Sequence, residues 1–338
     1  MTRPRVLLLC GGRSDEHEVS LASARSVLAA SGSSFELTPL VIARDGRLLP
    51  PEASARLLTA GERSGEATAP GGGLERLEPG SFDVVWPLLH GPYGEDGSVQ
   101  GLLKVMGLPF VGADVLGSAV GMDKAMMKAT FAAHGLPNVP YRLVTRSAWR
   151  SEPAAVVAEL ERLPYPLFVK PANLGSSVGI SRAEDETGLR DALELAARFD
   201  RRIVVERGLV GARELEVGVL GNDAPEASVV GEIGYAGAFY DYESKYTEGE
   251  ATLTVPAELP RRVAERCRAL ALEAFRAIDA AGLARVDLFW HGGRLYLNEI
   301  NTMPGFTQTS MYPKLWEASG VPYAELTERL VELALEPR

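Results

Sequence analysis

Three oxygen-bearing side chains near the end of the sequence, Asp287, Glu299 and Asn301, could bind a metal ion. They stand in two stretches that alternate like strands, separated by a turn signal at 291–294. Side chains two apart on a strand share a face, so Arg285 lies beside Asp287, and Glu299 beside Asn301. Hard oxygen ligands next to a cation suit magnesium and the phosphates that it carries. Taken alone, the alternation is more typical of the solvated face of an antiparallel hairpin, so the metal hypothesis depends on its neighbours.

The register of this hairpin decides whether the oxygens can meet. A turn made only of residues 292–293 would place Asp287 opposite Asn298 and would point Glu299 to the other face. A three-residue turn that ends at Arg294, with a bulge, would place Asp287 opposite Glu299. The metal hypothesis therefore predicts the longer turn.

A second candidate site follows the apolar strand that ends in Lys170-Pro171. A lysine at the end of such a strand is costly unless it is paired. The segment 175–179, Gly-Ser-Ser-Val-Gly, offers backbone N–H groups and hydroxyls to a phosphate. It is neither a Walker A loop nor a dinucleotide fingerprint, because the lysine precedes the glycines. The alternative interpretation is a hairpin turn beside a lysine whose charged end reaches solvent.

Several charged residues stand where helices or strands begin or end. Lys124 begins a helix, where a lysine is usually solvated, while Glu206 and Glu214 could accept hydrogen bonds from an adenine amine and ribose hydroxyls. Glu16 follows the first strand and could face a ligand ammonium, although a carboxylate there also suits a helix N-terminus. His90 lies in a glycine-rich loop and is equally open to both interpretations.

Composition limits the classes of function. A chain of 338 residues predicts two or three domains, and a net charge of −10 argues against binding nucleic acid or an anionic membrane. Two cysteines, Cys10 and Cys267, argue against a disulfide framework and fit a reducing cytoplasm. The apolar run 6–10 is too short for a signal peptide or a membrane span. The histidines have no zinc-ligand spacing, and no acyl-enzyme nucleophile motif is present.

The hydrophobic patterns predict an α/β chain in which glycine-rich loops follow strands, where open sheets bind ligands. A long polar loop with four aromatic residues, 237–250, is predicted to be an ordered lid. Strands are predicted near 5–10, 35–42, 83–89, 166–171, 202–206, 214–221 and 227–233, and helices near 20–30, 53–60, 98–106, 122–134, 187–199 and 259–281.

Eight motifs, in order from residue 5 to about 330, resemble those of D-alanine–D-alanine ligases, which have the ATP-grasp fold. They lie at 16–21, 90–97, 122–124, 170–171, 175–179, 239–246, 285–287 and 299–306. The resemblance implies an α/β (α+β) chain with an N-terminal Rossmann-like open-sheet domain at 1–112. Two α+β modules, 113–206 and 207–338, would hold ATP between them under the 237–250 lid. It also implies a cytoplasmic homodimer.

The resemblance implies a role for each candidate residue. For ATP the implied residues are Lys124 and Lys170 at the α/β-phosphates, Ser176 and Ser177 in the flap that begins at Gly175, Lys245 at the γ-phosphate, and Glu206, Arg207, Leu209 and Glu214 around adenosine. For two magnesium ions, which manganese could replace, they are Asp287, Glu299 and Asn301. For the D-alanines they are Glu16 with Ser176 and Tyr246 at the first ammonium, Arg285 and the Gly305 N–H at the oxyanion, Ser310 and Met311 at the second carboxylate, and His90.

The implied reaction is the ATP-dependent joining of two D-alanines through an acyl phosphate, for peptidoglycan precursor synthesis. Three alternatives stay open. A relative that accepts D-lactate is disfavoured by Tyr246, which the resemblance associates with amine acceptors. Another ATP-grasp carboxylate–amine ligase is disfavoured by the Glu16 motif and by segment 303–310. A non-catalytic nucleotide-binding regulator would usually lack metal ligands or the lid charge, and this chain has both.

Overall fold

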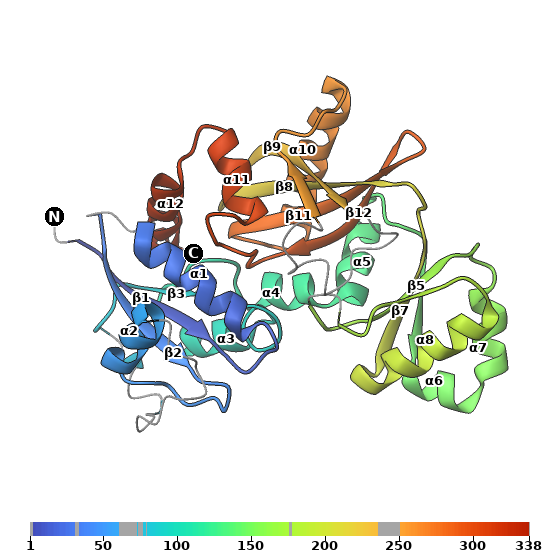
Figure 1. Cartoon of the computed structure of the whole chain (residues 1–338), viewed down its shortest axis with the longest axis horizontal. Coiled ribbons are helices and arrows are strands. Elements are labelled where there is room, and N and C mark those ends of the chain that lie inside the picture. Colours follow the sequence, from blue (N-terminus) through green and yellow to red (C-terminus); the bar gives the residue numbers. More distant parts are fainter. Residues whose placement is uncertain are drawn as a thin grey trace.

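The computed structural model describes residues 3–30, 34–60, 73, 77–78, 80–175, 178–235 and 251–337. These residues form three sheets, which Figure 1 shows as separate units joined through the helices α4 and α5. Segment 237–250 and the residues Ser176, Ser177, Lys245 and Tyr246 lie outside the described residues. Among the described helices, none is long and apolar enough to cross a membrane.

The N-terminal sheet is parallel, with strand order β2-β1-β3. Its strands are β1 (Arg5–Gly11), β2 (Glu36–Ile42) and β3 (Val84–Pro87), and its helices are α1 (His17–Ala30), α2 (Pro51–Ala60) and α3 (Ser98–Val105). A strand covered on both faces reads as a continuous apolar run, as β1 does. Val6 and Leu8 face one hydrophobic core, whereas Leu7 and Leu9 face the other.

The central sheet is antiparallel, with strand order β4-β7-β5-β6. Its strands are β4 (Tyr141–Thr145), β5 (Leu167–Pro171), β6 (Ser181–Ala183) and β7 (Arg202–Arg207), and its helices are α6 (Arg146–Ser151), α7 (Pro153–Leu160) and α8 (Glu186–Phe199). Asp185 caps α8 by accepting a hydrogen bond from the Gly188 N–H. Leu189 and Leu193 on the apolar face of α8 pack in the core of this sheet.

The C-terminal sheet is antiparallel, with strand order β10-β9-β8-β11-β12. Its strands are β8 (Arg213–Gly221), β9 (Glu226–Tyr235), β10 (Ala251–Thr254), β11 (Gly282–His291) and β12 (Arg294–Asn301). Helix α10 (Arg261–Ala277) covers one face, where its side chains pack with Val217 and Val219. Helix α11 (Met311–Ala318) covers the other face. It fits closely there because Gly218 and Gly231 have no side chains: a Cβ on either would lie within 3.0 Å of an α11 side chain.

The helix predicted at 122–134 corresponds to α5 (Lys124–Ala133), which begins two residues later than predicted. Helix α4 (Val115–Met122), which ends just before Asp123, was not predicted. The Asp123 carboxylate accepts hydrogen bonds from the N–H groups of Ala125 and Met126 and also pairs with Arg202. This N-cap ends one helix and starts the next, and it fixes Lys124 at the first turn of α5.

The pairing of the β11–β12 hairpin was predicted correctly, but its turn was not. Asp287 lies opposite Glu299, and Arg285 opposite Asn301. The turn holds only residues 292–293, because His291 pairs with Arg294. The register is restored by a bulge at Asn298 in β12, between the pairs 287–299 and 288–297.

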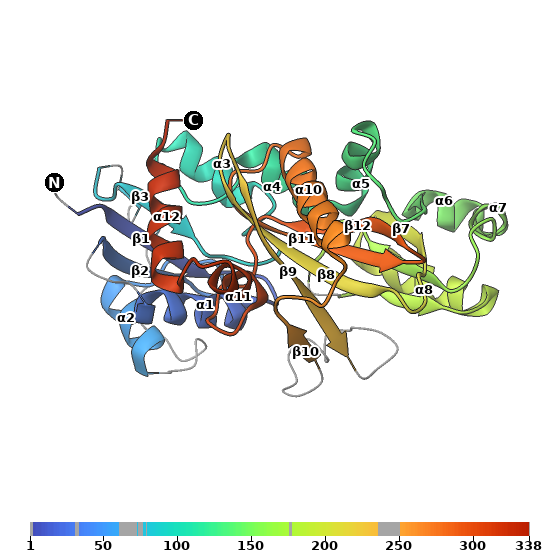
Figure 2. The ribbon, with the colours of Figure 1, turned by 90° about the horizontal axis from the view of Figure 1, so that it is seen from above.

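Helix α12 (Tyr323–Leu335) packs against the N-terminal sheet and also contacts α11, β8 and β11. Figures 1 and 2 both show it beside β1 and β3. Leu326 and Leu330 share a core with Val6 and Leu8. The predicted ranges 1–112, 113–206 and 207–338 each contain one sheet, apart from Arg207 at the end of β7. Their boundaries stay a prediction, because α12, in the third range, shares one core with the N-terminal sheet.

Candidate active site

A cavity of about 1380 Å³ opens between the three sheets. It gathers residues that the sequence separates by almost 300 positions. The predicted site residues that line it are Glu16, His90, Lys124, Lys170, Glu206, Arg207, Leu209, Glu214, Arg285, Asp287, Glu299, Asn301, Gly305, Ser310 and Met311. The structure thus brings together every predicted site residue that it describes.

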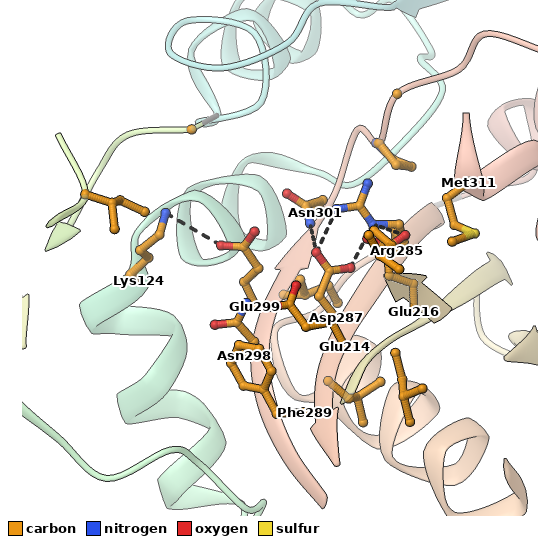
Figure 3. A pocket seen from close by; sticks show the side chains of 18 of the residues that line it. Lys124, Glu214, Glu216, Arg285, Asp287, Phe289, Asn298, Glu299, Asn301 and Met311 are labelled. Carbon is orange, nitrogen blue, oxygen red and sulfur yellow. Dashed lines mark hydrogen bonds and ion pairs between the residues drawn. The ribbon is translucent and has the colours of Figure 1, made fainter. Parts of the chain in front are cut away.

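Arg285 forms the centre of a charged cluster on β11, shown in Figure 3. Its guanidinium donates to both carboxylate oxygens of Asp287, at 2.7 Å each, and pairs with Glu216 at 3.1 Å. The Asn301 amide donates to Asp287 at 3.1 Å. Burial would lower the pKa of Arg285, but Asp287 and Glu216 outweigh it and hold that pKa well above its usual value. The cation is therefore permanent and its geometry is fixed.

Glu299 lies opposite Asp287 and faces a second cation. Lys124 reaches to 3.7 Å from the Glu299 carboxylate (Figure 3). Its Nζ also donates to the carbonyl of Leu174 at 2.7 Å. Residue 174 directly precedes the glycine-serine loop that begins at Gly175. Lys124 thereby connects the start of α5 to both Glu299 and the glycine-serine loop. A nucleotide phosphate bound between them would need a positive charge such as this one.

The oxygens of Asp287, Glu299 and Asn301 suit a hard divalent cation such as magnesium. Their pairing across β11 and β12 places them on one face, at the wall of the cavity. Within the described part of the chain, no three His, Cys, Asp or Glu side chains form a metal site. A metal here would therefore need the amide oxygen of Asn301, and phosphate oxygens would complete its ligands.

Glu206 on β7 is buried between two lysines. Its carboxylate pairs with Lys170 at 2.9 Å and with Lys128 at 3.0 Å. Burial alone would raise the pKa of Glu206, but the two lysines outweigh burial and lower it to about 2. The bulge residue Asn298 joins the group, because its carbonyl accepts from Lys128 at 3.3 Å and its side-chain oxygen accepts from Lys170 at 3.4 Å. Lys128 was not predicted as a site residue.

Glu16, at the wall of the cavity, is held between two glycine loops. A Cβ on Gly91 would lie 2.5 Å from its carboxylate oxygen, and a Cβ on Gly175 would lie 2.8 Å from the same oxygen. Gly91 also has a φ of +71°, which L side chains rarely adopt. Glycine at both positions allows the loops to close around this carboxylate.

His90 ties the N-terminal sheet to the segment that contains Gly305. Its Nδ1 lies 3.0 Å from the Met303 carbonyl and its Nε2 lies 3.2 Å from the Ser23 hydroxyl. The Ser23 hydroxyl also accepts from the N–H of Phe306 at 3.3 Å. Burial lowers the pKa of His90, which favours the neutral ring. In the structure His90 therefore holds the segment around Gly305 in place.

Glu95 is a further carboxylate at the cavity wall that was not predicted. It accepts a hydrogen bond from the Gly91 N–H at 2.7 Å and is 9% exposed. Burial, and then the negative charge of Glu16, raise the pKa of Glu95 to about 8. Its position in the motif at 90–97 was visible in the sequence, but its burial was not.

The segment after β12 leads into the N-terminus of α11. Phe306 is fully buried against Trp86 and Tyr323, with ring centroids 5.3 Å apart in both pairs, and the Tyr323 hydroxyl donates to its carbonyl at 2.6 Å. Ser310 is the N-cap residue of α11, and Met311 is the first helical residue. A helix N-terminus presents N–H groups and a partial positive charge, which suits a carboxylate.

Comparisons with known proteins agree over the whole chain. The family model described as "D-ala D-ala ligase N-terminus" matches residues 5–113, and the one described as "D-ala D-ala ligase C-terminus" matches residues 130–332. A D-alanine–D-alanine ligase of Deinococcus radiodurans is 55% identical, with 99% of each chain covered.

Two solved structures share the fold. The D-alanine–D-alanine ligase of Coxiella burnetii has a TM-score of 0.82 at 36% identity, covering 99% of this chain and 94% of the other. The VanG D-Ala:D-Ser ligase of Enterococcus faecalis has a TM-score of 0.86 at 31% identity, covering 98% and 100%. The ATP-grasp fold predicted from the sequence is thereby confirmed.

Proposed function

The chain belongs to the D-alanine–D-alanine ligase family, and from that premise we propose how its cleft performs the reaction. The protein is an ATP-dependent ligase that joins two D-alanines for peptidoglycan synthesis. The observation that supports the roles below is the convergence of Lys124, Lys170, Arg285 and Glu16 on one cavity. These residues supply cations for phosphates, a fixed guanidinium, and a carboxylate for an ammonium.

The ATP end of the cavity carries the lysines and the carboxylates. Lys124 and Lys170 bind the α- and β-phosphates, and Glu206 to Leu209 with Glu214 bind adenosine. Asp287, Glu299 and Asn301 hold magnesium, which when bound offsets the charge on the transferring phosphoryl group, and manganese could replace it. The flap serines Ser176 and Ser177 and the lid lysine Lys245 complete this part of the proposal.

The other end of the cavity binds the two D-alanines. Glu16, between Gly91 and Gly175, pairs with the ammonium of the first D-alanine, together with Ser176 and Tyr246. The γ-phosphoryl group of ATP is transferred to the carboxylate of this D-alanine, which gives an acyl phosphate and ADP. The unprotonated amine of the second D-alanine then attacks the acyl carbon, phosphate leaves, and the amine loses a proton as the peptide bond forms.

Arg285 and the N–H of Gly305 stabilise the oxyanion of the tetrahedral intermediate that this attack forms. One such donor is worth roughly 3–4 kcal/mol in comparable oxyanion holes. Ser310 and Met311, at the N-terminus of α11, receive the carboxylate of the second D-alanine, and His90 keeps segment 303–306 in place. Closing segment 237–250 would exclude water from the acyl phosphate.

The assay for this function measures ADP and phosphate release together with dipeptide. Release that depends on D-alanine, with D-alanyl-D-alanine as the product, supports the proposal, whereas ATP hydrolysis without dipeptide refutes it. Competing D-alanine against D-lactate and D-serine across pH defines the second acceptor. If Glu299→Gln left turnover unchanged, the non-catalytic interpretation would become the better one.

We also propose a cytoplasmic homodimer. ATP, the substrate of the reaction, is a cytoplasmic metabolite, and the two buried cysteines need no oxidising compartment. Size-exclusion chromatography with light scattering tests the oligomeric state, and a monomer mass at micromolar concentration would refute the dimer.

A further inference from the structure

The buried lysine Lys128 has no place in the mechanism above, although it lies next to it. Its side chain is 1% exposed, and it points from α5 to the Glu206 carboxylate at 3.0 Å. It also contacts the Asn298 carbonyl at 3.3 Å and lies 5.8 Å from the centre of the Tyr141 ring. Lys170, by contrast, reaches the same carboxylate but also lines the cavity.

In the cluster of Glu206, Lys128 and Lys170, two cations pair with one carboxylate. A carboxylate with only 3% of its side chain exposed requires a cation, because an unpaired buried charge is strongly destabilising. One lysine would be enough to meet that requirement. Two are present, and only one of them faces the space where a triphosphate would lie.

The geometry points to Lys128 as a positioning residue for ATP. This inference rests on the proposed roles of Lys170 and Glu206. We propose that Lys128 neutralises the Glu206 carboxylate, so that Lys170 is available to bind the phosphates. When Lys170 turns to ATP, the pair of Lys128 and Glu206 stays neutral and buried. Without Lys128, Lys170 would have to remain with Glu206, and phosphate binding would compete with that ion pair.

The bulge at Asn298 supports this division of roles. Its carbonyl and its side-chain oxygen accept from different lysines, at 3.3 Å from Lys128 and 3.4 Å from Lys170. The carbonyl thus gives Lys128 a second fixed partner besides Glu206. The side-chain oxygen can rotate away, whereas the carbonyl is fixed in the backbone of β12, so Lys170 is the more easily released of the two lysines.

The test compares Lys128→Met with Lys104→Met, which removes an exposed lysine that pairs with Asp114 at the surface. K128M should raise the KM for ATP by about tenfold, the effect of losing one charged contact, and leave the KM for D-alanine within about twofold. Inhibition by adenosine, which has no phosphates, should weaken much less than ATP binding. K104M should match the wild type in all three measurements.

Two results would overturn the inference. One is a K128M enzyme with reduced thermal stability but an unchanged KM for ATP, which would make Lys128 structural only. The other is an equal loss of ATP and adenosine binding, which would assign Lys128 to the adenine site. A wild-type protein that makes no dipeptide would instead contradict the proposed function, so the two failures are distinguishable.

A second comparison applies even if K128M does not fold. In E206Q the buried carboxylate is replaced by a neutral amide, so neither lysine is needed to balance it. E206Q and the double variant K128M/E206Q should therefore have the same KM for ATP. A KM that rises again when Lys128 is removed from E206Q would overturn the inference.

Discussion

Arg285→Ala is the substitution that most directly tests the proposed chemistry. The guanidinium makes two 2.7 Å hydrogen bonds to Asp287 and an ion pair of 3.1 Å to Glu216, at 22% side-chain exposure. If it also stabilises the oxyanion, its removal should lower kcat about 10²–10³-fold. The KM for ATP should change little, because the lysines and not Arg285 are proposed to bind the phosphates.

The same substitution also has a cost in stability that is separate from catalysis. It removes the cation from two carboxylates with side-chain exposures of 13% and 6%, Asp287 and Glu216. Removing one partner of such a buried pair costs about 3–5 kcal/mol. For a domain of this size that corresponds to a fall in Tm of roughly several degrees. A loss of kcat must therefore be measured well below the Tm of the variant.

The double variant E216Q/R285A separates the two effects. Neutralising Glu216 removes one of the carboxylates that Arg285 balanced, so part of the lost Tm should return. The kcat should stay low, because no oxyanion donor has been restored. E216Q alone keeps both hydrogen bonds between Arg285 and Asp287, and it should keep most of the activity.

Steady-state kinetics with coupled ADP detection and a thermal melt of each variant are sufficient for this test. A folded R285A enzyme with a kcat within about twofold of the wild type, less than 1 kcal/mol in the barrier, would refute the oxyanion role. If E216Q/R285A recovered kcat along with Tm, the role of Arg285 would be structural. In that case Gly305 alone would remain as the proposed donor.

Three further predictions follow from buried groups. The pKa of Glu95 is about 8 in the folded protein and 4.5 ordinarily, so between these pH values the folded protein keeps a proton that the unfolded chain has lost. The free energy of unfolding should therefore fall as pH rises from 4.5 to 8, and the Tm of E95Q should fall less over the same range. Equal falls in Tm for E95Q and the wild type would contradict this prediction. Burial raises the pKa of the Cys10 and Cys267 thiols to about 12, so a thiol reagent should label neither in the native protein and both after denaturation. Phe306 is fully buried, so Phe306→Ala should lower the free energy of unfolding by about 3–5 kcal/mol and should also lower kcat. F306L should keep most of the stability and most of the kcat. A kcat of F306A equal to that of the wild type would show that this ring does not position the neighbouring Gly305.

The sequence was most informative where chemistry and local pattern coincide. The alternation around Asp287 and Glu299 predicted two strands and their pairing, because one-residue slips would reverse the faces. The turn was wrong for a physical reason: a bulge anywhere in the hairpin corrects the register equally well. The bulge lies at Asn298, whose oxygens accept hydrogen bonds from Lys128 and Lys170, and no turn signal in the sequence marks that position.

Burial and long-range contact were the parts that the sequence did not reveal. Lys128 and Glu206 are 78 positions apart, and each alone reads as an ordinary charged residue. The Asp123 cap, in contrast, could have been found, because an aspartate before a helix-forming run is an N-cap signal. The roles of the site residues themselves stay proposals that the variants above address.

The packing of α12 has a consequence for how the protein is made. The N-terminal sheet is synthesised first, yet one of its faces is covered by Leu326 and Leu330, which leave the ribosome long afterwards. Chains generally fold domain by domain during synthesis. Leu21 and Val27 of α1 can cover Val6 and Leu8 early, but the contacts with α12 form only when nearly all of the chain has been translated. The first domain to be made is therefore among the last to be completed.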